Sequence, residues 1–248
     1  MKRALLLVLL AAPCARAHDH IEVGKDPSDS SRLGFDGPDF QLALYVPPGE
    51  PFSGYVPDFP GGWHASELTF SAEVNVLEAA EGSDPVFELV SVNGPSGAVF
   101  AFWDVGALSP SWEAPTGWTN SPGDTRSFPV ILGGEAHVHG RVFTMDTPGN
   151  YTVVFRATDA AEAYAPSANR TNTFSALAPP PLAIHIAGET ASLSFTSRLN
   201  LDYDLQSCTN LGGGVWTTQA SFFGDGSEKA HAAPLSGQPR AFYRLVEY

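Results

Sequence analysis

The sequence has very little cysteine, and this limits how the fold can be held together. Only Cys14 and Cys208 occur among the 248 residues. Cys14 lies in an N-terminal stretch that we predict to be removed, so the mature chain would keep one thiol and could not close an internal disulfide. Cys208 ends a run typical of a β-strand, and we expect a buried, inert thiol there. Stability must therefore come from a hydrophobic core, which a chain of this length can build.

Positive charge is also scarce. The chain has 13 Lys and Arg against 27 Asp and Glu, a formal net charge of −14. Loss of the N-terminal stretch would remove three basic residues and no acidic one, which makes the mature chain still more acidic. Such a surface repels nucleic acid and anionic lipid, so we expect no nucleic-acid partner. It suits a soluble exported protein or a surface that attracts cations.

Long hydrophobic runs are missing as well. The apolar run Ala4–Ala12 is too short to cross a bilayer as a helix. It follows the basic residues Lys2 and Arg3 and precedes Ala15-Arg16-Ala17, an arrangement typical of a cleaved signal peptide. We therefore predict a signal peptide over residues 1–17 and a mature chain that begins at His18. The protein would be secreted, periplasmic or displayed on the cell surface, with no transmembrane segment after cleavage.

Helix signals are nearly absent, whereas turn residues are plentiful. The 24 Gly and 21 Pro punctuate short runs that are rich in β-branched and aromatic residues. The spacing predicts an all-β protein, an immunoglobulin-like or jelly-roll-like β-sandwich followed by a small β domain. Only Glu73 to Ala80 has the pattern of a helical turn. Examples of the expected strands are Phe40–Val46, Glu67–Val76, Val86–Val92, Ala98–Trp103, Val138–Thr144, Tyr151–Ala157, Ala191–Phe195 and Phe242–Val246.

A proline-rich segment predicts the domain organisation. Ala178-Pro179-Pro180-Pro181-Leu182 would form a stiff, extended spacer. We place a linker over residues 178–182, between a β-sandwich domain at 18–177 and a small C-terminal β module at 183–248.

The clearest hairpin is predicted near the end of the first domain. Residues 137–144 and 151–157 resemble two strands, and Pro148-Gly149-Asn150 between them supplies turn chemistry. Side chains alternate across a strand, so His137 and His139 would share one face.

Histidines in two His-x-His pairs carry the metal-binding hypothesis. One pair is His18 and His20 at the predicted mature terminus, and the other is His137 and His139. A free α-amine with histidine in third position can wrap square-planar Cu²⁺ or Ni²⁺. Alternatively, His18 could chelate copper through its amine and ring as a histidine brace, with a second histidine as partner. A third arrangement places His20, His137 and His139 around Zn²⁺, with a carboxylate or His64 as fourth ligand.

Motifs of common enzymes are missing from the sequence. It contains no G-x-S-x-G, H-E-x-x-H, Walker or dinucleotide-binding pattern, so we favour a non-enzymatic role. Trp103, Trp112 and Trp118 lie in a Pro/Gly-rich region and are expected to pack into the core, although a sugar-stacking platform is an alternative.

The hairpin region resembles a known family. The quoted motifs are Gly94-Pro95-Ser96-Gly97, His137-Val138-His139, and Pro148-Gly149-Asn150-Tyr151-Thr152. Over about residues 18–160 the chain resembles the bacterial surface-anchored domains called choice-of-anchor M. That resemblance implies export to the cell surface or periplasm and a metal role for His18, His20, His137 and His139, because some relatives are tied to zinc supply or metal uptake. This sequence departs from the pattern in having no recognisable anchor.

The C-terminal segment resembles a second exported module. Leu205-Gln206-Ser207-Cys208-Thr209-Asn210-Leu211, then a tryptophan, then Phe242-Tyr243-Arg244-Leu245 is similar to a small β module found at the ends of bacterial secreted proteins. The resemblance implies a structural or attachment role.

Three functions therefore stay open from the sequence. The first is an exported β-sandwich that binds Zn²⁺ or Cu²⁺ at His18, His20, His64, His137 and His139. The second is a structural or adhesive surface protein, partnered with cell-surface or extracellular components, whose histidines are incidental. The third is a copper-dependent polysaccharide oxidase with an N-terminal histidine brace.

Overall fold

The computed structural model describes residues 19–48, 56–66, 68–211, 215–235 and 240–247. Within these ranges the chain forms eighteen strands and no helix, which confirms the all-β prediction. The helical turn expected over residues 73–80 is not formed. The same ranges contain no helix of the length and apolarity needed to cross a bilayer. The predicted signal peptide and His18 lie outside the described residues.

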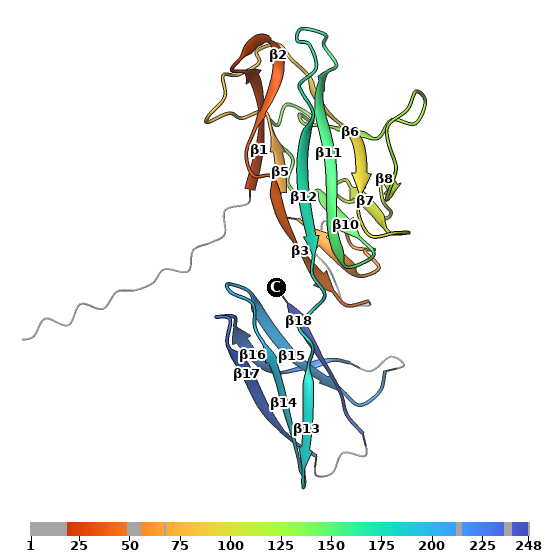
Figure 1. Ribbon diagram of the computed structural model, residues 1–248, viewed down its shortest axis with the longest axis vertical. Coiled ribbons are helices and arrows are strands. Elements are labelled where there is room, and N and C mark those ends of the chain that lie inside the picture. The colour runs from red at the N-terminus through yellow and green to blue at the C-terminus, as the bar shows by residue number, and fades with distance from the viewer. Residues whose placement is uncertain (1–18, 49–55, 67, 212–214, 236–239, 248) are drawn as a thin grey trace, which may run out of the picture.

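A three-stranded sheet contains the first strands (Figure 1). β1 (Asp19–Asp26) pairs with β2 (Asp29–Asp36) in an antiparallel hairpin and with β5 (Leu68–Ser71) in parallel. Ile21 and Val23 of β1 are fully or almost fully buried, and they alternate with residues that face away from the core.

A nine-stranded sheet makes up most of the rest of this half of the molecule. The strand order is β8-β7-β10-β4-β3-β12-β11-β6-β9. Its strands are β3 (Phe40–Val46), β4 (Gly62–Ala65), β6 (Pro85–Asn93), β7 (Val99–Trp103), β8 (Trp112–Pro115), β9 (Ser127–Pro129), β10 (Val142–Met145), β11 (Gly149–Asp159) and β12 (Arg170–Ala176).

The large sheet folds back on itself around an aromatic core. Phe143 of β10 lies 5.8 Å from Phe155 of β11 between ring centroids, although three strands separate β10 from β11 in the sheet. Phe100 and Phe174 likewise meet at 5.1 Å from strands on opposite halves. The two halves therefore face each other as in a β-sandwich, which is consistent with the predicted fold class.

The small sheet closes one side of this core. Phe70 of β5 lies 4.0 Å from Phe87 and 5.6 Å from Phe155 between ring centroids, in edge-to-face contacts. Aromatic pairs of this geometry add stabilisation beyond the area that they bury. The position of β1 and β5 is therefore fixed by side chains that the large sheet supplies.

The hairpin predicted for residues 137–157 is wrong. β10 pairs with β4 and β7, whereas β11 pairs with β6 and β12, so the two strands are not neighbours. The Pro148-Gly149-Asn150 segment connects the two halves of the folded sheet instead of closing a local turn. Turn chemistry specifies a change of direction but not the partner of the strand that follows.

Strands after the proline-rich segment form two further sheets, drawn below the others in Figure 1. One contains β13 (Ala183–Ala187), β14 (Thr190–Thr196) and β17 (Glu228–Pro234), and the other β15 (Asp202–Cys208), β16 (Thr217–Phe223) and β18 (Phe242–Glu247). Leu42 and Leu44 of β3 pack against their apolar cluster, and Arg198 pairs with the buried Glu247. Cys208 is a buried free thiol, as expected.

We expect Phe87→Ala to lower the free energy of unfolding by about 3–5 kcal/mol, because this buried ring joins the two sheets. Urea denaturation measures the change. The matched control is Phe223→Ala, whose ring is 61% exposed and whose loss should change stability by less than about 0.5 kcal/mol. Equal losses for the two variants would contradict the assigned core.

Candidate functional site

The outer face of the small sheet holds the first candidate ligand. Because Ile21 faces the core, the side chain of His20 points away from it. His20 pairs in register with Thr69 of β5, and Ser71 follows on the same outer face. Both β5 residues are small, so they leave room above the strand for larger side chains from either side.

His137 comes to this face from the other side of β5. Its backbone forms an isolated antiparallel bridge with Ser71, and the Ala72 amide donates to the Ala136 carbonyl at 2.8 Å. The strand expected over residues 138–144 begins only at Val142, so His137 and His139 do not share the face of a strand. The prediction that alternation along a strand would bring His137 and His139 onto one face was therefore wrong.

The loop nevertheless brings the imidazoles together. Nε2 of His137 and Nε2 of His139 lie 2.9 Å apart, with the rings nearly perpendicular at 84°. The ring of His20 meets that of His137 edge-on, with a centroid separation of 5.2 Å. Three of the predicted ligands, from two distant parts of the chain, thus form one cluster, which we call the histidine cluster.

A carboxylate stands behind the central histidine. Oε2 of Glu73 lies 3.4 Å from Nδ1 of His137, on the side of the ring opposite Nε2. A histidine that holds a metal through one nitrogen usually has its other nitrogen oriented by a carboxylate or carbonyl. The sequence did not single out Glu73, because nothing in its local pattern shows that it would lie beside His137, which is 64 positions further along the chain.

Glu22 fixes the loop that carries Glu73. Its buried carboxylate accepts hydrogen bonds from the Asn75 amide at 2.9 Å, the Val76 amide at 3.0 Å and the Asn75 side chain at 2.9 Å. Burial by itself would raise the pKa of Glu22, but these hydrogen bonds outweigh it and lower the pKa. β1 therefore carries His20, which belongs to the cluster, and also Glu22, which holds the loop that contains Glu73.

His64 does not belong to the cluster. It lies in the middle of β4, between Trp63 and Ala65, which face the core. Its own ring packs 6.4 Å from Phe59, on the outer side of the large sheet. His64 on β4 is therefore buried beside Phe59, apart from the ring contact between His20 and His137. Burial lowers the pKa of His64 to about 4, so the ring is neutral near pH 7.

The donor atoms of the described residues do not form a complete metal-binding site. Among the described residues, no group of three or more His, Cys, Asp or Glu has its atoms converged on one ion. His20 meets His137 through ring edges, and a rotation of its side chain would be needed to turn a nitrogen toward the other two. His18, on which the two terminal copper arrangements depend, lies outside the described residues.

The three tryptophans do not make an exposed stacking platform. Trp103 is only 4% exposed. Trp112 stacks on Phe102 at 5.3 Å between ring centroids, and the guanidinium of Arg126 lies 4.3 Å over the ring of Trp118. These contacts are those of side chains that pack within the protein, as the sequence analysis expected for the three tryptophans.

No protein-family model and no curated protein matches the chain.

We expect Glu22→Gln to cost about 1–3 kcal/mol of stability at pH 7, because an amide cannot accept all the hydrogen bonds made by the carboxylate. The folded-state pKa of Glu22 is below its ordinary value of 4.5. Its contribution is therefore fully present above pH 4.5 and is lost as the pH falls through the folded-state value.

Urea denaturation from pH 7 to pH 3 tests both parts. The difference between wild type and Glu22→Gln should shrink toward acid. An exposed carboxylate, Glu113, provides the control, and Glu113→Gln should match wild type across the range. If the free energy of unfolding differed by the same amount between Glu22→Gln and wild type at all pH values, the assignment of a charged Glu22 carboxylate in the folded protein would be wrong.

Proposed function

We propose that this protein binds Zn²⁺ or Cu²⁺ outside the cytoplasm, in the periplasm, at the cell surface or in the medium. The ligands are the imidazoles of His20, His137 and His139. Glu73 orients His137 from behind. The remaining coordination positions are filled by water or by residues of the N-terminus.

The close approach of two ring nitrogens carries the proposal. Two ligands about 2.0–2.1 Å from one metal ion are separated by about 2.9 Å at a right angle and by about 3.3 Å at a tetrahedral angle. The Nε2 atoms of His137 and His139 lie 2.9 Å apart. This separation suits two ligands of one ion, and rotation of each ring until its lone pair points off the line between the two nitrogens would place both on that ion.

The protonation pattern supports the same site. Nδ1 of His137 lies 3.4 Å from the Glu73 carboxylate, and on this contact we assign the proton of the ring to Nδ1 and the lone pair to Nε2. Nε2 of His139 then donates to it in the metal-free protein. A metal ion would displace that single proton, and binding should weaken as the pH falls.

Charge favours a cation at this face. The net charge of the chain is −14, and the Glu73 carboxylate beside the cluster is 63% exposed. Such a field raises the local concentration of cations. The resemblance to choice-of-anchor M domains, drawn from the motifs around His137, points to the same role.

We expect His137→Ala/His139→Ala to lose at least tenfold in affinity for Zn²⁺ and Cu²⁺, because it removes both converging nitrogens. The measurement is metal content by mass spectrometry after purification without chelator, followed by competition against a chromophoric chelator. The matched control His185→Ala/His231→Ala also removes two histidines but on β13 and β17, and it should bind as wild type does.

Wild-type protein that carries no stoichiometric metal and binds neither ion would overturn the proposal and leave a structural or adhesive surface protein. Equal affinity in the two double variants would place any metal site elsewhere in the chain.

A separate prediction concerns Glu73. We expect Glu73→Gln to weaken metal binding about 10–100-fold while the protein stays fully folded, because its side chain is exposed and acts only through His137. Glu81→Gln, another exposed acid nearby in sequence, is the control for lost charge. An identical weakening in both variants would show that Glu73 acts only through the overall field.

A further inference from the structure

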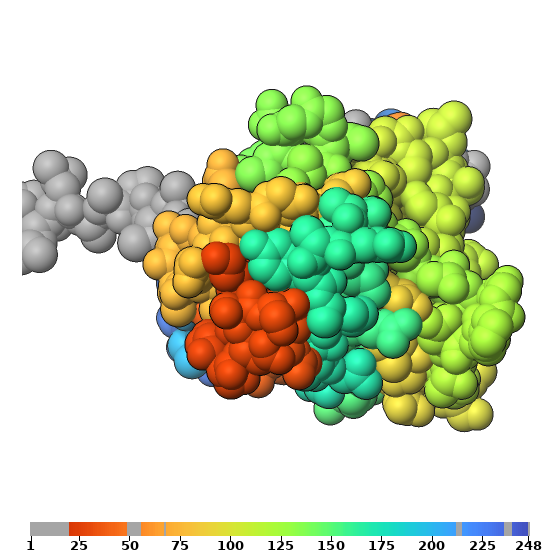
Figure 2. All heavy atoms as spheres, turned by 90° about the horizontal axis from the view of Figure 1, so that it is seen from above, coloured from red at the N-terminus to blue at the C-terminus, as the bar shows by residue number. Residues whose placement is uncertain are grey.

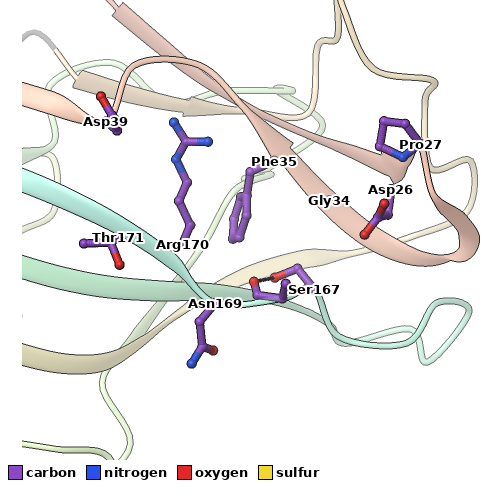
Figure 3. A pocket seen from close by; sticks show the side chains of 10 residues that line it. Asp26, Pro27, Gly34, Phe35, Asp39, Ser167, Asn169, Arg170 and Thr171 are labelled. Atoms are coloured by element: carbon purple, nitrogen blue, oxygen red, sulfur yellow. Dashed lines mark hydrogen bonds between the residues drawn. The ribbon is translucent and has the colours of Figure 1, made fainter.

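A cleft of about 410 Å³ opens in the seam between the small sheet and the large one, remote in sequence from His137 and His139 (Figure 3). On one side of it, the Leu33 amide of β2 donates to the Ala165 carbonyl at 2.9 Å. On the other side, the Thr173 amide of β12 donates to the Asp39 carbonyl at 2.7 Å. Residues 33–39 and 165–173 are thus hydrogen-bonded to each other at both ends of the cleft, and the cleft lies between these two points.

Long side chains hold the two segments at a fixed separation. The guanidinium of Arg170 donates to the Gly37 carbonyl, and the side-chain amide of Asn172 donates to the Pro38 carbonyl at 3.1 Å. Gly37 has a φ of +126°, and a Cβ on it would lie 2.3 Å from the His20 carbonyl oxygen. The opening is therefore built into the backbone, as expected for a preformed ligand site.

β2 also meets the segment between β11 and β12 at the surface. Figure 2 shows the β1–β2 hairpin against the segment that follows β11, at the end of the molecule that faces the viewer. The backbone bridge between Arg32 and Ala165 joins these two segments. The cleft is thus bounded by regions that are distant in sequence and firmly attached to each other.

An aromatic ring lines the cleft. Phe35 is half-buried and packs against Phe87 of the core with a centroid separation of 5.2 Å. In Figure 3 its side chain lies between Arg170 and Ser167, within the group of residues that surround the opening. The ring offers an apolar surface whose orientation the core fixes from behind.

Polar groups with spare hydrogen-bonding capacity surround this ring. Asp39, Asn169 and Thr171 line the cleft and are exposed. Within the described part of the chain, their side chains make no hydrogen bond to the protein. A carboxylate, an amide and a hydroxyl together offer both donors and acceptors to a ligand.

The charges around the cleft select against an ion. Asp26 is paired with Arg32 at 3.3 Å, which leaves one carboxylate, Asp39, and one guanidinium, Arg170, so neither a bare anion nor a bare cation finds an excess of opposite charge. The strongly acidic chain further disfavours anions. A neutral ligand with many hydroxyl groups and one less polar face fits both the aromatic surface and the mixed donors and acceptors.

We propose that this cleft binds a single neutral sugar ring, with its C–H face against Phe35 and its hydroxyls bonded to Asp39 and Asn169. The volume is within the range of small-molecule sites. This binding activity is independent of the histidine cluster and of the metal proposal.

Saturation-transfer NMR of the whole protein with D-glucose, D-galactose, D-mannose and N-acetyl-D-glucosamine, each at about 10 mM, tests the proposal at the weak affinities expected of a single ring. At least one sugar should receive saturation on its ring protons. For that sugar, Asp39→Ala and Asn169→Ala should each weaken binding about fivefold. Phe35→Leu, which keeps an apolar contact with the core, should weaken it at least as much.

Controls separate the cleft from general effects. Asp202→Ala removes an exposed carboxylate from β15 and should leave sugar binding unchanged. His137→Ala/His139→Ala should also leave it unchanged, so the two proposals can fail separately. Melting temperatures of the Asp39 and Asn169 variants should equal that of wild type, because these side chains make no bonds within the described protein.

Several outcomes would overturn the sugar assignment. One is the absence of saturation transfer to all four sugars. Another is a wild-type signal in the combined Asp39→Ala/Asn169→Ala variant. A third is preferential binding of glycine or glutamate, tested in the same way, which would make the cleft a site for amino acids.

Discussion

The burial of aromatic side chains between the small sheet and the folded large sheet is the constraint on which the other features depend. Phe70 and Phe87 lie at this junction, and their contact fixes where β5 runs. β1 is hydrogen-bonded to β5, so its outward residues take their positions from the same packing. If the core did not hold these strands, His20 would have no defined relation to His137.

The two proposed sites use that constraint in different ways. The histidine cluster lies on the outward face of the small sheet, where alternation along β1 turns His20 and Glu22 away from the core and the loop after β5 covers Glu22. The sugar cleft lies at the edge of the same sheet, where Phe35 is partly covered by the core and partly open. The outward face carries the three imidazoles, and the edge carries exposed polar groups around an aromatic ring.

The carboxylates of the site are differentiated by their surroundings and not by their sequence context. Glu22 is buried and satisfied by backbone amides, which favour its charged form and make it structural. Glu73 is exposed and contacts an imidazole, which suits it to orient a ligand. Both are glutamates in or beside strands, and the difference between them arises from how residues 72–78 fold over β1.

Local sequence patterns specified the class of fold and about half of the strand positions, because alternating apolar residues and frequent Gly and Pro are local signals. β3 has the bounds predicted for it, Phe40–Val46. Histidine spacing also nominated His20, His137 and His139 as a group. Long-range packing specified that β10 and β11 are not paired, that His64 is buried beside Phe59, and that Glu73 stands behind His137. These are long-range contacts, and no local pattern specifies which distant segment a strand or loop will meet once the core has formed.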